Sequence, residues 1–434
     1  MSSRTLQAWI NDRNVGELRD ENGIWSFVYT PQWVNAGDGY ALSPALPKQL
    51  DPIVDSSSTR SVQWYFDNLL PEEGARTLLA KDATVDVADA FGLLAYYGAE
   101  SAGSLILTAS DSEPNVSGEK QLPDSELQAR IEKLPKISLN SGAAKRMSLA
   151  GAQHKLAVIY RDDTIFEPIG RTPSTHILKP DHPDGDYPHS VVNEYFVMRL
   201  ADALKLDIPN VYRRYVPAPI YLIERFDRRH RGTVIERTHV IDACQALNLD
   251  RQFKYAEGSV ERLRELAERC TVPVAARLNL YSWLVFNLLV GNSDAHLKNL
   301  SFLVTDRGIK PAPYYDLIAV GVYDTIAIGK GNWPATPLAW PLCGQATFGG
   351  LTRATFLEAA AALGIANETA GRLLNAQLDR IETLAREILS TLEAENTGLV
   401  AKRGELAATL AGETRCLRAI IEIVIREMVA KLKQ

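Results

Sequence analysis

The chain has 434 residues, of which 46% are hydrophobic and 23% are charged, and its formal net charge is −6. This length allows two or three domains rather than one small core, and the hydrophobic fraction excludes an intrinsically disordered chain. The acidic balance argues against a protein whose whole surface binds nucleic acid, but it is compatible with a local basic patch.

The cysteines and the N-terminus indicate the compartment. The four cysteines are far apart and form no CxxC pair, so neither a zinc site nor a disulfide framework is expected. Residues 1–14 carry charges where a signal peptide needs an apolar core, and no uninterrupted apolar run reaches the length of a membrane span. We therefore expect a cytoplasmic protein with reduced thiols and no membrane segment.

Residues 4–108 are expected to form a mixed α/β module. The apolar patterns indicate strands at 5–11 and 25–34 around a turn at 20–23, a helix at 62–80 and a further strand at 102–108. The polar residues 110–120 that follow are typical of a linker.

The pattern changes after this linker. Strand-like segments lie at 156–160, 175–180 and 220–226, with a helical period at 190–206. From about residue 238 the chain is mostly helical apart from a hairpin-like stretch near 300–316, and residues 355–434 fit a helical bundle. The sequence thus predicts a sheet-rich lobe followed by a helical lobe, and a cleft between such lobes is a common ligand site.

A polar stretch interrupts two apolar runs at residues 290–303. Asp294 and Asn299 are separated there by four residues, and Asp316 follows after the hairpin. Phosphoryl transfer from ATP needs such a set, in which one carboxylate deprotonates the attacking hydroxyl while an Asn and a second carboxylate hold magnesium. The simpler alternative is a helix N-cap in which His296 and Lys298 are solvated.

Two upstream features favour the phosphoryl-transfer interpretation. Residues 148–155 contain small residues and precede a strand, so their backbone N–H groups could approach phosphate, although Gly151 is the only glycine among them. Lys179 ends a strand where its ammonium could reach the α- and β-phosphates, unless it is simply a solvated strand end.

The remaining features are weaker alone. Glu194 lies on the helix after Lys179 and could pair with it, but any surface helix carries a glutamate. The backbone of Glu224 and Phe226, at the junction between the lobes, could contact adenine, or the segment could be an edge strand that ends in a charged turn. The order of all these elements along the chain is more specific than any one of them.

Several longer motifs support this order, and they carry a resemblance that covers nearly the whole chain. They are YALSPALP, FDNLLPEE, GAESAGSLIL, SLAGAQHKLAV, THILKP, NEYFVMRLADALKL, ERFDRR, DACQALNLD followed by KY, GNSDAHLKN and PYYDLI. In these motifs the sequence resembles the HipA family of bacterial serine/threonine kinase toxins. The resemblance implies an α+β, bilobal protein-kinase-like fold with an N-terminal module at 1–120, a small lobe at 121–230 and a helical large lobe at 231–434.

The resemblance also implies roles for single residues. Asp294 is the expected catalytic base, Asn299 and Asp316 are the expected Mg²⁺ ligands, and Glu194 is the expected ion-pair partner of Lys179. Ser148 matches the serine whose autophosphorylation switches the family's kinases off. The expected ATP contacts are Ala150, Gly151, Ala152, Gln153, His154, Lys155, Lys179, Glu224, Arg225, Phe226, His296, Leu297, Lys298, Asn299, Tyr315 and Asp316.

The family's partners are expectations of the same kind. The usual antitoxin is a HipB-like helix-turn-helix dimer that binds operator DNA, and known targets are aminoacyl-tRNA synthetases. Two departures stand out: His154 replaces a commonly acidic residue, and residues 329–350 do not match the family's DNA-contacting segment. Target choice, any direct DNA contact and the role of residues 321–350 are therefore left open. The alternatives are a catalytically silent, nucleotide-binding corepressor and a small-molecule kinase on the same fold.

Overall fold

The computed structural model describes residues 3–109, 117–143, 147, 149–232 and 234–433. The chain divides into two compact units, and each is described by itself. The first unit contains residues 1–180, 222–254 and 301–312, and the second contains residues 181–221, 255–300 and 313–434. One boundary between them falls inside strand β11, and another falls at the Lys254–Tyr255 peptide bond.

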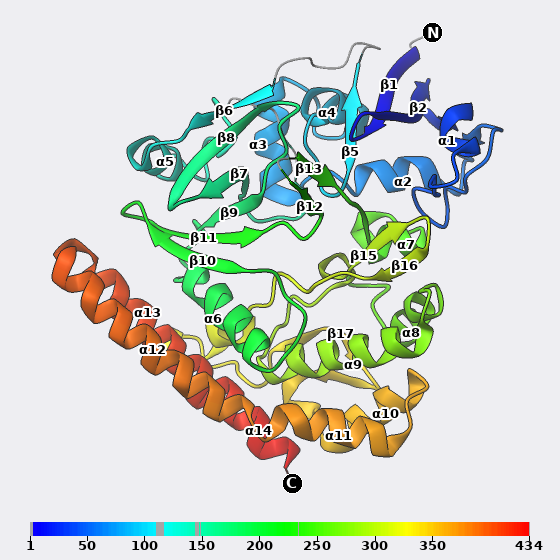
Figure 1. Ribbon diagram of the computed structural model, residues 1–434. Helices are drawn as coiled ribbons and strands as arrows, with labels where there is room; N and C mark the ends of the chain where they lie inside the picture. The colour runs from blue at the N-terminus through cyan, green and yellow to red at the C-terminus, as the bar shows by residue number, and fades with distance from the viewer. Residues whose placement is uncertain (1–2, 110–116, 144–146, 148, 233, 434) are drawn as a thin grey trace. The chain divides into compact units, whose positions relative to one another are not determined.

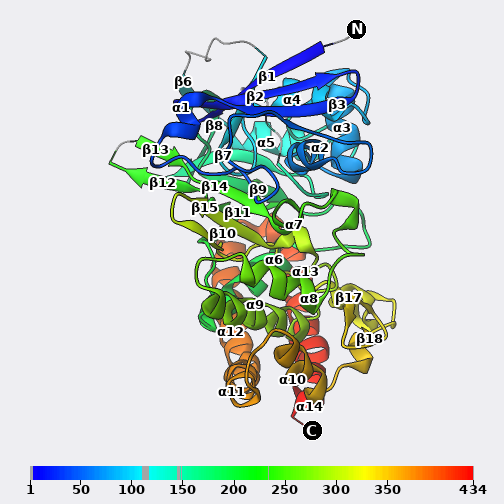
Figure 2. The same cartoon turned by 90° about the vertical axis from the view of Figure 1, so that its right-hand side faces the viewer.

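The first unit begins with a five-stranded antiparallel sheet of order β4-β3-β2-β1-β5 (Figure 1). Its elements are β1 (Ser3–Ile10), β2 (Arg13–Glu21), β3 (Ile24–Tyr29), α1 (Pro31–Asn35), β4 (Ile53–Val54), α2 (Ser61–Asp67), α3 (Glu73–Ala83), α4 (Ala90–Tyr97) and β5 (Leu105–Thr108). Alternate residues of β1 are buried, as a half-buried strand requires. Asn22 and Gly23 both adopt positive φ between β2 and β3, which suits a tight hairpin turn. Helix α2 packs against β3 (Figure 2), and α4 packs against β5.

A second sheet of the first unit has the order β11-β9-β7-β8-β6. Its elements are β6 (Ser117–Gln121), α5 (Asp124–Ile131), β7 (Leu156–Arg161), β8 (Thr164–Gly170), β9 (His176–Pro180) and β11 (Pro219–Glu224). The unit is completed by β12 (Arg228–Arg231), β13 (Val234–Arg237), β14 (His239–Asp242), α7 (Ala243–Leu247), a 3₁₀ turn at Arg251–Phe253, β15 (Ser301–Thr305) and β16 (Gly308–Pro311). Asp242 and Gln245 form a reciprocal capping box that starts α7.

The second unit is mainly helical. Its elements are α6 (Ser190–Ala203), β10 (Val211–Tyr215), α8 (Val260–Glu268), α9 (Pro273–Leu289), 3₁₀ turns at Leu297–Asn299, Val320–Asp324, Ile326–Ile328, Phe348–Gly350 and Gly404–Leu406, β17 (Pro337–Leu342), β18 (Gln345–Thr347), α10 (Arg353–Ala362), α11 (Asn367–Leu378), α12 (Ile381–Lys402), α13 (Ala407–Ala419), a π-helical turn at Ile420–Ile425 and α14 (Arg426–Leu432). Helix α9 is almost wholly buried along its C-terminal half and packs against α8, α11 and α14. Helices α12 and α13 lie side by side (Figure 1).

Several expected elements differ from those observed. The helix expected at 62–80 is two helices, because Pro71 lies between α2 and α3 and cannot donate the hydrogen bond a continuous helix needs. The strand expected at 25–34 ends at Tyr29, since Pro31 begins the short helix α1 with Thr30 as its N-cap. The expected linker ends in a strand, because residues 117–121 pair with β8. No helix in the described ranges is long and apolar enough to cross a membrane.

Candidate active site

The polar stretch follows directly from the end of α9 in the second unit. Gly291 turns the chain there with φ of 69°, and a Cβ at this position would meet Val424 and Trp333 at 2.6 and 3.2 Å. Its carbonyl accepts a hydrogen bond from the N–H of Gly321 at 2.7 Å. Only glycine combines the left-handed turn with this close packing, so the start of the stretch is fixed by tertiary contacts.

Asp294 has a backbone that is held from both sides. Its N–H donates to Oδ1 of Asn292 at 3.0 Å, and its carbonyl accepts from the N–H of His296 at 2.8 Å and from Nδ2 of Asn299 at 2.7 Å. The side chain, in contrast, is 49% exposed. A rigid backbone that presents an accessible carboxylate is suited to proton transfer.

The helix-cap alternative is wrong for this stretch. A 3₁₀ turn of three residues, Leu297–Asn299, is all that follows, and no side chain caps it. His296 and Lys298 are buried, with 7% and 6% of their surface exposed, rather than solvated. Most of the polar residues between the two apolar runs are therefore buried, whereas Asp294 is half exposed.

Asn299 and Asp316 lie on two segments that hydrogen bonds join. Tyr315 donates its hydroxyl to the carbonyl of Lys298 at 2.9 Å, and Nδ2 of Asn292 lies 3.5 Å from the carbonyl oxygen of Asp316. Asp316 itself adopts a left-handed φ of 53°, which is strained for a residue with a Cβ and is typical of functional sites. These hydrogen bonds bring the two segments together, and the joint role of Asn299 and Asp316 as Mg²⁺ ligands stays a prediction.

The loop expected to cradle phosphate belongs to the first unit. Gly151 has φ of 107°, and a Cβ there would lie 2.8 Å from Nζ of Lys155. That ammonium donates to the carbonyl of Ala150 at 2.8 Å, so the loop carries its own cation. The carbonyl of Gly151 accepts from the N–H of Glu72 at 3.1 Å, which ties the loop to the N-terminal module.

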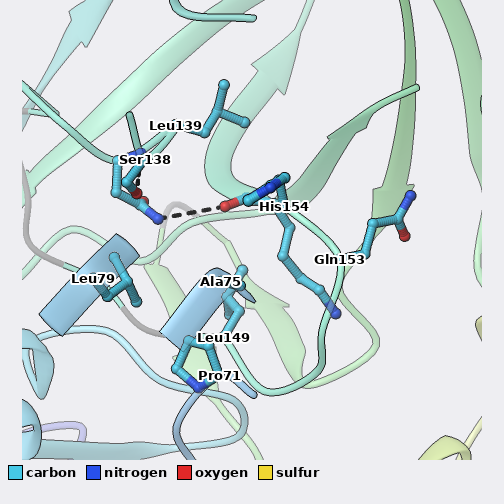
Figure 3. A pocket seen from close by; sticks show the side chains of 10 residues that line it. Pro71, Ala75, Leu79, Ser138, Leu139, Leu149, Gln153 and His154 are labelled. Carbon is cyan, nitrogen blue, oxygen red and sulfur yellow. Dashed lines mark hydrogen bonds between the residues drawn. The ribbon is translucent and has the colours of Figure 1, made fainter. Parts of the chain in front are cut away.

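A small pocket borders this loop (Figure 3). It is lined by Pro71, Ala75 and Leu79 on one side, by residues 138–140, and by Leu149 and residues 153–155 of the loop. Nδ2 of Asn140 lies 3.5 Å from the carbonyl oxygen of Lys155. His154, at a position where an acidic residue is common in the family, thus lines this pocket.

Lys179 and Glu194 lie in different units, and their ion pair stays a prediction. Lys179 at the end of β9 is 3% exposed, so the solvated-strand alternative is wrong. Within the second unit, Glu194 is 3% exposed, and its charge acts on the buried Tyr221 hydroxyl. Burial raises the pKa of that hydroxyl well above its ordinary value, and the charges of Glu194 and Asp316 raise it further. The negative charges of Glu194 and Asp316 therefore both favour the protonated form of the Tyr221 hydroxyl.

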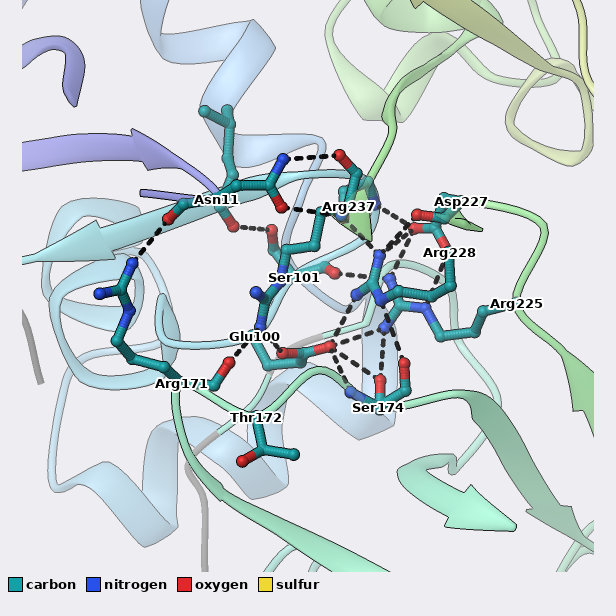
Figure 4. A network of polar contacts seen from close by, with 12 residues as sticks. Asn11, Glu100, Ser101, Arg171, Thr172, Ser174, Arg225, Asp227, Arg228 and Arg237 are labelled. Carbon is teal, nitrogen blue, oxygen red and sulfur yellow. Dashed lines mark hydrogen bonds and ion pairs between the residues drawn. The ribbon is translucent and has the colours of Figure 1, made fainter. Parts of the chain in front are cut away.

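The segment Glu224–Phe226 alternates in burial, with Arg225 inside and its two neighbours half-buried. The N–H of Arg225 continues the sheet by donating to the carbonyl of Thr175 at 2.8 Å. All five guanidinium N–H groups point into a buried network rather than toward a ligand (Figure 4). The side chain of Arg225 is thus engaged within the protein, and the ATP contact expected of Arg225 stays a prediction.

The network around Arg225 centres on Glu100, which is fully buried in the first unit. Glu100 accepts hydrogen bonds from Arg225, Arg228 and Arg237 at 3.2, 2.7 and 3.0 Å. Burial lowers the pKa of Arg228 to about 10, and the neighbouring Arg225 charge acts in the same direction. Burial alone would raise the pKa of the Asp227 carboxyl, but Arg225 and Arg228 bring it below its ordinary value.

Several residues that shape the site had no role predicted from the sequence. Tyr255 donates a hydrogen bond to Oδ1 of Asp294, Trp340 donates to the carbonyl of Ala295, and Asn292 orients Asp294. The KY pair at 254–255 was visible as a motif, but its contact with a residue 39 positions away was not readable from spacing. Ser148, the predicted autophosphorylation site, lies outside the described residues.

Two family models match the chain. The model described as HipA N-terminal domain matches residues 6–108, and the model described as HipA-like C-terminal domain matches residues 147–386, more than half of the chain. This chain belongs to the HipA family. Every candidate site residue that the structure describes lies within the HipA-like C-terminal domain, whereas Glu100 lies in the HipA N-terminal domain.

Relatives of this HipA-family chain are named as kinases. The serine/threonine-protein kinase toxin HipA of Shewanella oneidensis is 33% identical over 343 residues, which cover 74% of this chain and 76% of that protein. The protein named "Putative kinase Y4mE" of Sinorhizobium fredii is 37% identical over 346 residues, which cover 75% of this chain and 80% of that protein. These names support kinase activity at a general level.

A solved structure supports the fold. A chain from the complex of Shewanella oneidensis HipA, HipB and operator DNA superposes with a TM-score of 0.77 at 27% identity, covering 98% of this chain and 99% of that one. The match confirms the α+β, kinase-like HipA fold, with a sheet-rich N-terminal region and a helical C-terminal region. The division into three domains at 120 and 230 stays a prediction.

Proposed function

We propose that this HipA-family chain is a serine/threonine protein kinase toxin that uses Mg-ATP. The observation that carries the proposal is the arrangement of Asp294, whose backbone is fixed by Asn292 and Asn299 while its carboxylate stays accessible. In the proposed reaction the substrate hydroxyl gives its proton to Asp294 as its oxygen bonds to the γ-phosphorus. The bond from that phosphorus to the bridging oxygen breaks, and ADP leaves.

The donor set fits magnesium. Asn299 uses Nδ2 to bind the carbonyl of Asp294, and its Oδ1 accepts no hydrogen bond within the described residues, so a hard oxygen is available. Asp316 adds a carboxylate. The described ranges contain no cluster of three His, Cys, Asp or Glu residues that could hold a metal, so an ion would rely on Asn299, Asp316 and phosphate oxygens, as magnesium commonly does. When bound, magnesium would neutralise charge on the phosphates.

We assign the other nucleotide contacts to residues of the first unit. The loop 150–155 and Lys179 are proposed to bind phosphates, and the backbone of Glu224 and Phe226 is proposed to contact adenine. Two features support this assignment. Gly151 allows a tight turn of the loop backbone, and the Lys155 ammonium, which donates to the Ala150 carbonyl, places a positive charge beside the loop. Among the expected contacts near the base, His296, Leu297, Lys298 and Tyr315 are proposed to line the nucleotide site.

The family of this chain supports a proposal for its biological role. We propose a cytoplasmic toxin that phosphorylates a protein, with an aminoacyl-tRNA synthetase as the expected target, and so causes growth arrest or persistence. A HipB-like antitoxin dimer is the proposed inhibitor and the main operator-DNA contact, because this chain is acidic and its structural relative was solved with HipB and operator DNA. Autophosphorylation of Ser148 is the proposed second means of inhibition.

Labelled ATP and cell extract test the proposal. The purified chain, incubated with γ-labelled Mg-ATP and extract from cells that lack its antitoxin, is expected to label one or a few proteins, which mass spectrometry then identifies. Label only in a small molecule would favour a small-molecule kinase. Absence of any transfer despite tight nucleotide binding would favour a silent corepressor.

A further inference from the structure

The carboxylate of Asp294 has two oxygens in unequal surroundings. Oδ1 accepts a hydrogen bond from the hydroxyl of Tyr255, and Nε2 of His296 lies 4.0 Å from the same oxygen. Oδ2 accepts no hydrogen bond from any described residue, and the side chain is half exposed. The carboxylate is therefore held by one oxygen and open at the other.

Tyr255 is itself held in place by contacts at both ends. The N–H of Gly258 donates to the carbonyl of Tyr255 at 3.0 Å, which closes a turn. The Tyr255 ring meets the His296 ring edge-on, with centroids 4.9 Å apart and an interplanar angle of 80°. The ring position thus depends on the turn and on His296 as well as on Asp294.

Trp340 supports both the turn and the catalytic stretch. A Cβ on Gly258 would lie 2.5 Å from Cδ1 of Trp340, so the turn lies directly against the indole. The indole Nε1 of Trp340 donates to the carbonyl of Ala295 at 3.1 Å, next to Asp294. The Trp340 side chain therefore contacts both the turn that carries Tyr255 and the stretch that carries Asp294. This gives Trp340, within residues 321–350, a structural role that the sequence did not reveal.

We propose that Tyr255 is a positioning residue for the catalytic base. Its hydroxyl holds Oδ1 of Asp294 so that Oδ2 faces the substrate hydroxyl and receives its proton during phosphoryl transfer. The inference rests on the proposed function, because it assumes that Asp294 is the base. It adds that the rotamer of this exposed carboxylate is set by a tyrosine outside the polar stretch, on the segment that precedes α8.

The physical reason is the freedom of an exposed aspartate. Without a partner, the side chain would populate several rotamers, and a displacement of about 1 Å at the reacting atoms can cost about a hundredfold in rate. A charge-assisted hydrogen bond from a phenol that is itself packed restricts this freedom. Tyr255 is 38% exposed, so removal of its hydroxyl should leave the fold intact.

Steady-state kinetics of Tyr255→Phe test the inference. The variant keeps the ring against His296 but loses the hydroxyl. It is expected to lose about tenfold to a hundredfold in kcat, with KM for Mg-ATP, nucleotide affinity and thermal unfolding unchanged. The matched control is Tyr281→Phe, which removes a hydroxyl that donates to the carbonyl of Phe356 at 3.2 Å in the same unit and should keep the parental kcat.

The outcomes separate this inference from the proposed function. If Asp294→Asn is inactive while Tyr255→Phe equals the parent, the base assignment survives and the positioning role is wrong. A higher kcat in Tyr255→Phe would mean that the tyrosine blocks the base and would also overturn the inference. Loss of nucleotide affinity or thermal stability in step with kcat would reduce Tyr255 to a structural residue. Parental transfer by Asp294→Asn would reject both the base and its positioning residue.

Discussion

Arg225 donates a hydrogen bond to Glu100 at 3.2 Å, although 125 positions separate them in the chain. Both side chains are buried, and the contact joins the HipA N-terminal domain to the strand that ends at the proposed adenine contact (Figure 4). Arg225 also reaches Asp227 and the carbonyl of Ser101, at 2.6 and 2.9 Å. The backbone proposed to bind adenine therefore depends on the N-terminal domain for its position.

Glu100→Gln should destabilise the protein. The amide cannot neutralise three buried arginines, and breaking a buried ion pair typically costs about 3–5 kcal/mol. Urea unfolding of the variant and the parent measures this difference. Arg225→Lys should also lower stability, because an ammonium cannot span the same partners as a guanidinium.

The matched control is Glu268→Gln, which alters an exposed glutamate that pairs with Arg264 at 2.9 Å. An exposed pair contributes little, so this variant should unfold as the parent does. Equal free energies of unfolding for Glu100→Gln and Glu268→Gln would contradict the role assigned to the buried network.

Asp316→Ala should weaken nucleotide binding only when magnesium is present. A carboxylate that ligates the ion contributes through the ion, so the loss of ATP affinity should be at least about tenfold with Mg²⁺ and small in EDTA. Isothermal titration of ATP under both conditions measures the two affinities. Equal losses in both would show that Asp316, with its left-handed backbone, has a structural role instead.

A buried carboxylate in the second unit predicts a pH dependence of stability. Glu413 on α13 accepts hydrogen bonds from Arg213 and Tyr215 of β10 at 3.1 and 2.7 Å. Burial raises the pKa of its carboxyl to about 7, against the opposing effect of Arg213, and nearby Asp181 raises it further. From pH 4.5, its ordinary pKa, to about 7, the folded protein keeps a proton that the unfolded chain releases. The free energy of unfolding therefore falls as pH rises through this window.

Glu413→Gln should remove this contribution. Between about pH 5 and about pH 8 the parent should lose about 3 kcal/mol of stability relative to the variant. Urea unfolding at both pH values measures it, with Glu393→Gln, an exposed change on α12, as the control that should follow the parent. Parallel pH profiles for parent and Glu413→Gln would show that Glu413 is ionised in the folded state throughout.

Ser148 should accept phosphate from the protein's own nucleotide. A phosphoserine adds nearly two negative charges beside a loop proposed to bind phosphate, so the modified fraction should lose ATP affinity. Intact-mass and peptide analysis after incubation with Mg-ATP should locate the phosphate. Ser148→Ala should keep nucleotide binding and escape the inhibition, whereas Ser148→Asp should bind ATP poorly. Undiminished ATP binding by the phosphorylated fraction would show that self-inhibition does not act in this way. The alternative role for Ser148 would then be to cap a turn, as a serine at a loop start commonly does.

Sequence reasoning reached the elements that local patterns define. The strands β7, β9 and β11, the helix α6 and the hairpin β15–β16 follow from periodicity and turn residues. It missed β2, because its polar, exposed side alternates with too few strongly apolar residues to mark a strand. It also joined α2 to α3, since the apolar spacing continues across Pro71.

The candidate site divides in the same way. Asp294, Asn299 and Asp316 were readable because the chemistry demands their types in that order. The supporting contacts were not, because they join distant positions: Tyr255 with Asp294, Trp340 with Ala295, and Glu100 with Arg225. The direction of the Arg225 side chain in particular depends on a partner in another domain, which no local pattern specifies.

Asp294→Asn provides the most direct test of the central claim, that Asp294 is the base of a protein kinase. Asn keeps the shape of the side chain but cannot accept the substrate proton. The measurement is phosphoryl transfer to the labelled protein targets beside Mg-ATP affinity, with Asp306→Asn, an exposed loop change, as the control. The account predicts parental Mg-ATP affinity with transfer reduced by at least about a thousandfold in Asp294→Asn, and parental values of both in the control. Transfer by Asp294→Asn at the parental rate would contradict it.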